Sequence, residues 1–137
     1  MKKAKKTRVK VVNRTETNAD DFAIFVAASE EYLAYFGLLD WKVVYSHEDY
    51  EGALAWWESG PTANRCVRIG LSVDWGQEIV TEKQVCKSAF HEVCELLLAS
   101  LADKACKYFN WTIVEEDTHA VIRRLENSVF ETLWEER

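Results

Sequence analysis

The chain has 137 residues, 48% of them hydrophobic, and a formal net charge of −6 at pH 7. This length and apolar content suit one domain with its own core, and no apolar run approaches the length that spans a bilayer. The basic N-terminus lacks the apolar segment and the cleavage site of a signal peptide, so we expect a cytoplasmic protein with no membrane partner.

Charge is distributed unevenly along the chain. Residues 1–14 carry seven Lys or Arg side chains and no acid, so the total of −6 leaves −13 for the residues that follow. We therefore expect a basic flexible leader over residues 1–15 and a single domain over residues 16–137. An acidic body argues against nucleic acid as a partner, except for weak contact between the leader and a phosphate backbone.

The first predicted element is a helix over residues 18–36. Thr17 to Asp20 supply a capping side chain and an acidic first turn, apolar residues follow at helical spacing, and Gly37 offers a stop. Beyond it, the segments DWKVVYSHEDY and GALAWWES are rich in β-branched and aromatic residues and are separated by polar ones. They predict two strands of a meander.

Alternation of residue types predicts a third strand over residues 66–73. Val67, Ile69, Leu71 and Val73 alternate with small or polar residues, as expected for a strand with one buried face. This is the clearest strand pattern in the chain.

Capping signals predict two further helices. Thr81, followed three residues later by Gln84, matches a capping box and begins a helix over residues 82–107. Thr112 with Glu115 gives a similar signal for a last helix that continues almost to the end of the sequence. The element order is therefore one helix, three strands and two helices. This is an α+β fold in which a small antiparallel sheet packs on the central helix.

The helix over residues 82–107 contains an unusual group of ionisable residues. In the sequence SAFHEVCELLLASL, His91, Glu92 and Glu95 lie among apolar side chains, where uncompensated charges are costly. His91 and Glu95 are one turn apart on one face, so an imidazole nitrogen and a carboxylate can converge on one cation. Glu92 can lean toward a water held by that cation, as in H-E-x-x-H, where the intervening Glu is the general base.

Two other interpretations of this group stay open. His91 and Glu95 can form a buried pair while Glu92 faces solvent, and Cys94, three residues after His91, can bind zinc as a thiolate. We favour His91 and Glu95 as ligands of Zn²⁺, because carboxylate is an accepted zinc ligand, and Glu92 as the catalytic base.

A catalytic zinc site needs a third protein ligand, and the last helix offers Glu115, Glu116 and His119. Glu115 and His119 are one turn apart on one face. If Glu115 is the capping partner of Thr112, its carboxylate is engaged with backbone, so we prefer His119. The predicted site is then two imidazoles and one carboxylate around Zn²⁺, with water in the fourth position.

These motifs together resemble the zincin superfamily, and more closely the small predicted metallopeptidases of phage genomes that are distantly similar to SprT-like proteins. The resemblance extends from Phe22 to Leu133 and rests on LDWKVVYSHED, CVRIGLSVDW, SAFHEVCELLLASL and EEDTHAVIRRLEN. It implies a minimal zincin in which the motif helix gives two ligands and a base. It also implies a third ligand from the C-terminal helix, and the spacing in thermolysin-type enzymes suits Glu115 or Glu116.

The motif departs from the family pattern at Glu95, where zincins carry a second histidine. A carboxylate lowers the charge of the site and makes zinc a weaker Lewis acid. The resemblance also places the strand over residues 66–73 beside the cleft, where an extended peptide can add as another strand.

The function predicted from these features is zinc-dependent hydrolysis of a peptide bond in a peptide or protein substrate, with Tyr108 as a candidate donor to the oxyanion. The alternative is a catalytically degenerate zincin fold that binds a partner, such as a host protein, through its acidic surface and exposed aromatic residues. Candidates for that surface are Trp56, Trp57 and Trp134. In a third interpretation, a metal only links the last two helices.

Overall fold

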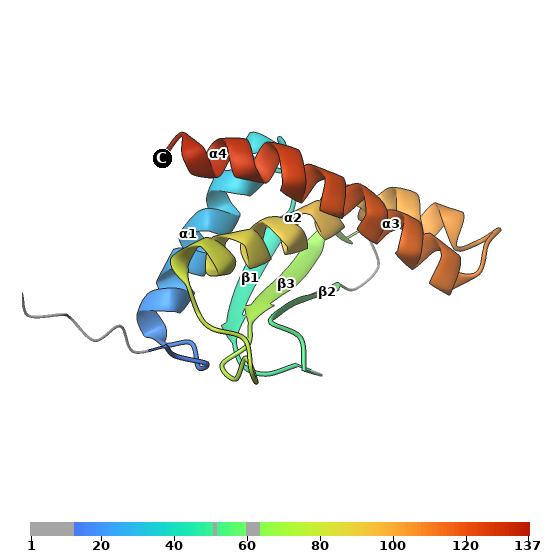
Figure 1. Cartoon of the computed structure of the whole chain (residues 1–137). Helices are drawn as coiled ribbons and strands as arrows, with labels where there is room; N and C mark the ends of the chain where they lie inside the picture. Colours follow the sequence, from blue (N-terminus) through green and yellow to red (C-terminus); the bar gives the residue numbers. More distant parts are fainter. Residues whose placement is uncertain (1–12, 51, 60–63) are drawn as a thin grey trace, which may run out of the picture.

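A computed structural model describes residues 13–50, 52–59 and 64–137 (Figure 1). Most of the predicted leader, residues 1–12, lies outside the described residues. No helix within the described ranges is both long enough and apolar enough to cross a membrane. The predicted α+β class and the order of one helix, three strands and two helical segments are confirmed. The elements are α1 (Ala19–Tyr35), β1 (Lys42–His47), β2 (Ala55–Ser59), β3 (Cys66–Leu71), α2 (Glu82–Ala105), α3 (Trp111–Leu125), η2 (Glu126–Phe130) and α4 (Glu131–Glu135).

The three strands form one mixed sheet in the order β1–β3–β2. β3 pairs in parallel with β1 and antiparallel with β2. The predicted antiparallel meander is therefore wrong in its pairing, because the last strand in sequence occupies the centre of the sheet. Val67, Ile69 and Leu71 are buried as predicted, whereas Val73 lies beyond the end of β3 and is half-buried.

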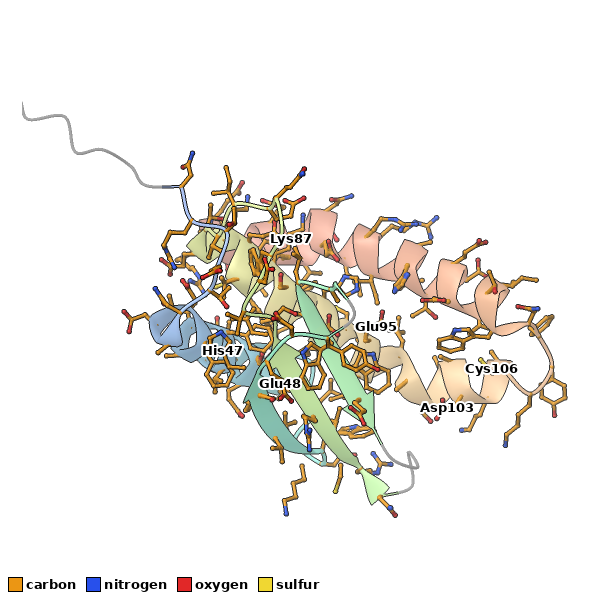
Figure 2. The ribbon with its side chains drawn as sticks, turned by 90° about the horizontal axis from the view of Figure 1, so that it is seen from below. His47, Glu48, Lys87, Glu95, Asp103 and Cys106 are labelled. Atoms are coloured by element: carbon orange, nitrogen blue, oxygen red, sulfur yellow. The ribbon has the colours of Figure 1, made fainter. Side chains whose placement is uncertain are left out.

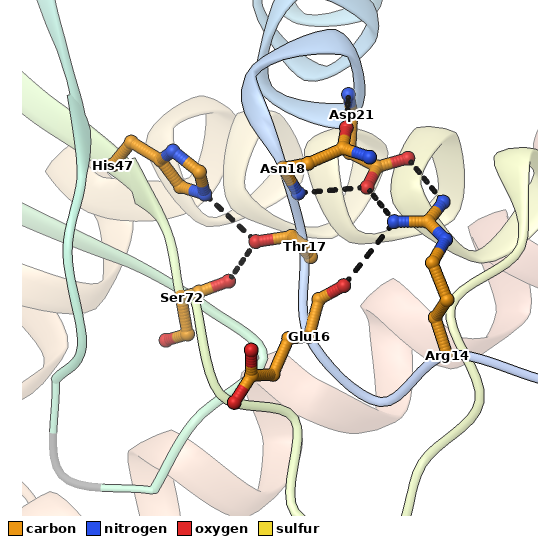
Figure 3. Close-up of polar contacts among 7 residues, drawn as sticks. All are labelled: Arg14, Glu16, Thr17, Asn18, Asp21, His47 and Ser72. Atoms are coloured by element: carbon orange, nitrogen blue, oxygen red, sulfur yellow. Dashed lines mark hydrogen bonds and ion pairs between the residues drawn. The ribbon is translucent and has the colours of Figure 1, made fainter.

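Polar contacts fix the start of α1 to the sheet (Figure 3). Asn18 caps α1, since its side chain accepts from the Asp21 N–H at 3.0 Å and the Asp21 carboxylate accepts from the Asn18 N–H at 2.9 Å. Arg14 donates to the same carboxylate at 2.8 Å. Thr17 Oγ1 lies 2.7 Å from Nε2 of His47, at the end of β1. The residues just before α1 are thus held against the body of the domain.

α2 is the central element of the fold. Thr81 caps it as predicted, accepting from the Gln84 N–H at 3.1 Å. α1 packs along α2, the sheet lies beneath it, and the run of α3, η2 and α4 passes over it (Figure 1). Apolar side chains of α1, α2 and β3 form the core, among them Phe25, Tyr32, Leu33, Ile69, Leu71, Val85, Phe90, Val93 and Leu96.

The last helical run begins at Trp111 and is capped by Asn110, whose side chain accepts from the Thr112 N–H at 2.8 Å. The predicted capping box of Thr112 and Glu115 is therefore wrong. Asn is a stronger cap than Thr, and Asn110 lies directly before the first residue of α3. α3 continues directly into the π-helical segment η2 and then α4. Because a π-helical turn contains an extra residue, it changes which side chains face α2.

Candidate metal centre

Three ionisable side chains of α2 and α3 converge on one point between the two helices. Nε2 of His119 lies 2.8 Å from Oε1 of Glu95, and Nε2 of His91 lies 3.5 Å from the same oxygen. One ligand atom from each residue lies within 4.8 Å of the others. The structure thus brings His91, Glu95 and His119 together in a group that can hold a metal ion.

The chemistry and spacing of this group fit a divalent ion. Zinc binds imidazole nitrogen at about 2.0–2.1 Å and carboxylate oxygen at about 2.0–2.2 Å, so the donors of a tetrahedral site lie roughly 3.3 Å apart. The two nitrogen–oxygen distances in the group, 2.8 and 3.5 Å, bracket this value. Three protein donors leave a fourth position open, as in catalytic zinc sites. Two nitrogens and one oxygen also suit other divalent transition metals.

Glu126, the first residue of η2, orients His91. Its Oε1 lies 2.7 Å from Nδ1 of His91, and its Oε2 lies 3.8 Å from Nζ of Lys87. With Nδ1–H donated to this carboxylate, Nε2 is the nitrogen that faces Glu95 and His119. Histidines that bind metals are commonly held in this way by a carboxylate.

Sequence reasoning missed Glu126, which follows His91 by 35 residues. A local motif on one helix contains no information about a partner at that separation. One signal can identify it: Glu126 follows His119 by seven residues, and this spacing places both side chains on one face of a helix, two turns apart.

The carboxylates around His91 change its affinity for protons. Burial by itself lowers the pKa of His91, but hydrogen bonds to Glu126 and Glu95 and the charge of Glu92 outweigh burial and raise it to about 10. Burial by itself raises the pKa of Glu95, but the hydrogen bond to His91 and the charge of His119 outweigh burial and lower it. The two carboxylates therefore favour the protonated form of His91, and a metal ion competes with a proton for its Nε2.

Glu92 is buried beside this group, so the interpretation in which it faces solvent is wrong. It is 7% exposed and lines a cavity of about 220 Å³ together with Ser88, His91 and Glu126. Burial raises the pKa of Glu92 to about 8; the charge of His91 opposes this shift and the neighbouring carboxylates reinforce it. A carboxyl with a pKa near neutrality, next to a ligand group, is suited to general acid–base chemistry.

A second cavity, of about 270 Å³, lies further along α2. Glu95 and His119 form part of its wall, so the candidate metal centre lies between the two cavities. The other residues of its wall are Trp57, Ala99, Ala102, Asp103, Trp111, Glu115 and Thr118.

The predicted place for an extended peptide, β3, is wrong, because only the edge strands β1 and β2 have an edge that no described strand occupies. β3 is paired on both edges, whereas the outer edge of β2 pairs with no strand among the described residues. Ala55 lines the first cavity and Trp57 the second.

Trp56 points to the opposite face of the sheet and is buried, so the prediction that it is exposed is wrong. Trp57 and Trp134 are half-buried.

Other candidate residues lie outside the group. Glu115 lines the second cavity and Glu116 is exposed, and neither belongs to the group of three that the described residues form. Tyr108 is exposed in the connection between α2 and α3 and lines neither cavity. Cys94 is fully buried and does not belong to the group of three; burial together with nearby carboxylates raises the pKa of its thiol to about 12.

The chain matches no family model, and comparison with curated proteins and with solved structures also found no match. The central finding is a His–Glu–His group that can hold a metal ion.

Proposed function

We propose that this protein is a zinc-dependent peptidase, in which His91, Glu95 and His119 hold the metal and Glu92 is the general base. One observation carries the proposal. Nε2 of both histidines faces a single oxygen of Glu95, while Glu126 holds the other nitrogen of His91. An imidazole fixed by one carboxylate, with its free nitrogen directed at further donors, is typical of metal sites.

The chain's own residues supply most of the proposed chemistry. A bound zinc ion contributes Lewis acidity, which polarises a peptide carbonyl and makes water a better nucleophile. Glu92 accepts a proton from the attacking water as its oxygen adds to the carbonyl carbon. When the C–N bond breaks, Glu92 returns that proton to the departing amine, so the carboxylate is restored.

The outer edge of β2 is the proposed position of the substrate backbone. Its N–H and C=O groups pair with no strand in the part of the chain that the structure describes, and they can bind an extended peptide as an additional strand. This edge lies beside both cavities, since Ala55 lines one and Trp57 the other. A peptide bound there has side chains available to each cavity on either side of the candidate metal centre.

The first experiment combines metal analysis with cleavage of a mixed peptide library, followed by mass spectrometry. We expect one zinc ion per chain, and we expect Glu92→Gln to lower cleavage by at least about 10²-fold while zinc remains bound. His119→Ala is expected to lower both zinc content and cleavage. Wild-type protein that binds zinc and cleaves no peptide, or Glu92→Gln protein that cleaves normally, would contradict the proposal.

An exposed apolar groove favours a second candidate function, a protein-binding module. Leu101, Phe109 and Ile113 are exposed at the far end of α2 and α3 and line a cavity of about 360 Å³ that also contains Asp117. Contiguous exposed apolar surface marks interaction sites, and an acid in the groove favours a basic amphipathic helix as the occupant.

Binding of such a helical peptide distinguishes the two functions. Binding that is lost in Ile113→Glu and kept in His91→Ala would support the module. The protein-binding module would be excluded if the helical peptide does not bind and the protein contains zinc and cleaves peptides.

A further inference from the structure

The cavity beside Glu95 and His119 has an unusual combination of wall residues. It contains two indole rings, from Trp57 and Trp111, together with small and acidic side chains. Its volume of about 270 Å³ is below the ~300–1,000 Å³ of pockets that enclose a whole small ligand. This size suits one long side chain of a bound peptide.

The small residues provide the room and the indoles provide the flat surfaces. Ala99 and Ala102 lie one and two turns of α2 beyond Glu95, and they leave space that a larger residue would fill. Trp57 is half-buried on β2, and Trp111 is exposed at the start of α3. An indole face attracts a guanidinium or ammonium group, and guanidinium also stacks on it.

Acidic side chains dominate the charges of the pocket away from His119, which lies at the end next to the candidate metal centre. Asp103 and Glu115 line the pocket, and neither forms an ion pair with another described residue, whereas Glu126 at the first cavity is paired with Lys87. No Lys or Arg among the described residues lines the second cavity. Lys87, Glu95 and Asp103 follow one another along α2, with the cation at one end and the acid at the other (Figure 2).

We propose that this cavity binds an arginine or lysine side chain of the substrate. The side chain's stem lies against the alanines and the indoles, and its cationic end reaches Asp103 and Glu115. The role of the cavity as a substrate pocket rests on the proposed peptidase function, but its capacity to bind the cation does not. The peptidase therefore cleaves next to basic residues.

Direct binding tests the pocket without any catalysis. Full-length protein, with and without zinc, is titrated with acetyl-arginine methylamide, its lysine analogue and the neutral isostere acetyl-citrulline methylamide. The indole N–H signals of Trp57 and Trp111 report binding by NMR. We expect arginine to bind about tenfold more tightly than citrulline, since the isostere loses both the ion pairs and the cation–π contact. Equal binding of arginine and citrulline would overturn the proposal.

Charge-removing variants assign the binding to this cavity. Asp103→Asn and Glu115→Gln are each expected to weaken arginine binding by roughly threefold, in line with partly exposed ion pairs. Glu58→Gln is the matched control, because Glu58 is exposed next to Trp57 but lines none of the cavities described above. Arginine affinity that is unchanged in both pocket variants, or lowered equally by Glu58→Gln, would overturn the assignment.

Peptide cleavage then separates this inference from the proposed function. In the library, cleavage enriched beside Arg or Lys, with the enrichment reduced in Asp103→Asn, supports both. Arginine binding by a protein that cleaves nothing supports the cation pocket and removes the peptidase. Cleavage with no preference for basic residues supports the peptidase and overturns the pocket as its specificity site.

Discussion

Glu126 determines which nitrogen of His91 can bind a metal. Its carboxylate holds Nδ1 at 2.7 Å and leaves Nε2 toward the centre. Carboxylates that hold a metal-binding histidine typically contribute 10–100-fold to metal affinity, so we expect Glu126→Ala to weaken zinc binding by about that factor. Glu126→Gln keeps an acceptor oxygen and is expected to recover part of the loss. Competition with a chelating dye measures the affinity.

A control on the same helical run is available at Glu131. Its carboxylate lies 2.8 Å from Nζ of Lys83, away from the histidines. Glu131→Ala removes a comparable ion pair and is expected to leave zinc affinity unchanged. If Glu126→Ala binds zinc as tightly as Glu131→Ala does, Glu126 pairs with His91 but does not position it for a metal.

The residues of the centre differ in how well the sequence predicts them. His91 and Glu95 are one turn apart, so helix geometry alone brings them together. His119 lies in the group, but no capping box of Thr112 and Glu115 excludes Glu115 in its favour, because Asn110 caps α3. Glu126 depends on packing between two helices, which no local spacing on α2 encodes.

At the scale of elements, Asp21 makes the start of α1 sensitive to acid. Burial by itself raises the pKa of Asp21, but the hydrogen bonds from Arg14 and from the Asn18 backbone outweigh burial and lower it. A carboxyl with a lower pKa in the folded chain than in the unfolded chain stabilises the fold above its unfolded-state pKa. That stabilisation is lost as the pH falls through the folded-state pKa.

We therefore expect Asp21→Ala to lower the free energy of unfolding by about 1–2 kcal/mol at pH 7, because it removes half of the capping box of α1 and the ion pair with Arg14. The difference from wild type should shrink below about pH 4, where the carboxyl of the unfolded chain is protonated. Guanidinium chloride unfolding over this pH range measures it, with the exposed neighbour in Asp20→Ala as control. A difference that stays constant down to pH 2 would exclude this role of the Asp21 charge.

The pairing of β2 with β3 requires glycine at position 70. A Cβ there would overlap Cε2 of Trp56, whose Nε1 donates to the Glu48 carbonyl at 3.1 Å. We expect Gly70→Ala to displace the indole and lower the free energy of unfolding by about 1–3 kcal/mol, measured by urea unfolding. Trp56→Ala removes the overlap, so the double variant should lose less than the sum of the single losses. Additive losses would contradict this packing.

Element type is easier to predict from this sequence than element pairing. The alternating residues of β3 indicate a strand with one buried face, and the Thr81 cap indicates where α2 begins; both follow from local geometry. The order β1–β3–β2 joins segments that are distant in sequence, and the same alternation fits a parallel or an antiparallel partner. No local pattern therefore indicated that β3 is the central strand, with one parallel and one antiparallel partner.

At the scale of the whole molecule, the candidate metal centre and the residues of the two cavities beside it follow one stripe of α2. Lys87, His91, Glu95, Ala99 and Asp103 recur at intervals of four residues, and each lines one of the two cavities. Because four residues slightly exceed one helical turn, the stripe rotates slowly around the helix and meets η2 at one end and α3 at the other. One helix thus connects the candidate metal centre to both cavities.

The candidate metal centre also joins two helices, because Glu95 and His119 are 24 residues apart. An ion bound only by the folded chain stabilises it, by about 2.7 kcal/mol when zinc is present at 100 times its Kd. For a domain of this size we expect zinc to raise the Tm by roughly 5–10 °C in differential scanning calorimetry, and EDTA to reverse the shift. Mg²⁺ should have no effect, because it prefers six oxygen ligands.

Variants of the two histidines locate that stabilisation. His119→Ala is expected to lose the Tm shift, because the ion then has no ligand on α3 to link to α2. A shift that persists in His91→Ala/His119→Ala would place the zinc elsewhere and contradict the candidate centre. The Tm shift can disappear in the variants while the wild-type protein cleaves no peptide. That pair of results would mean that the ion only links the two helices. The same calorimetric series therefore separates a catalytic ion from one that only stabilises the packing of α2 against α3.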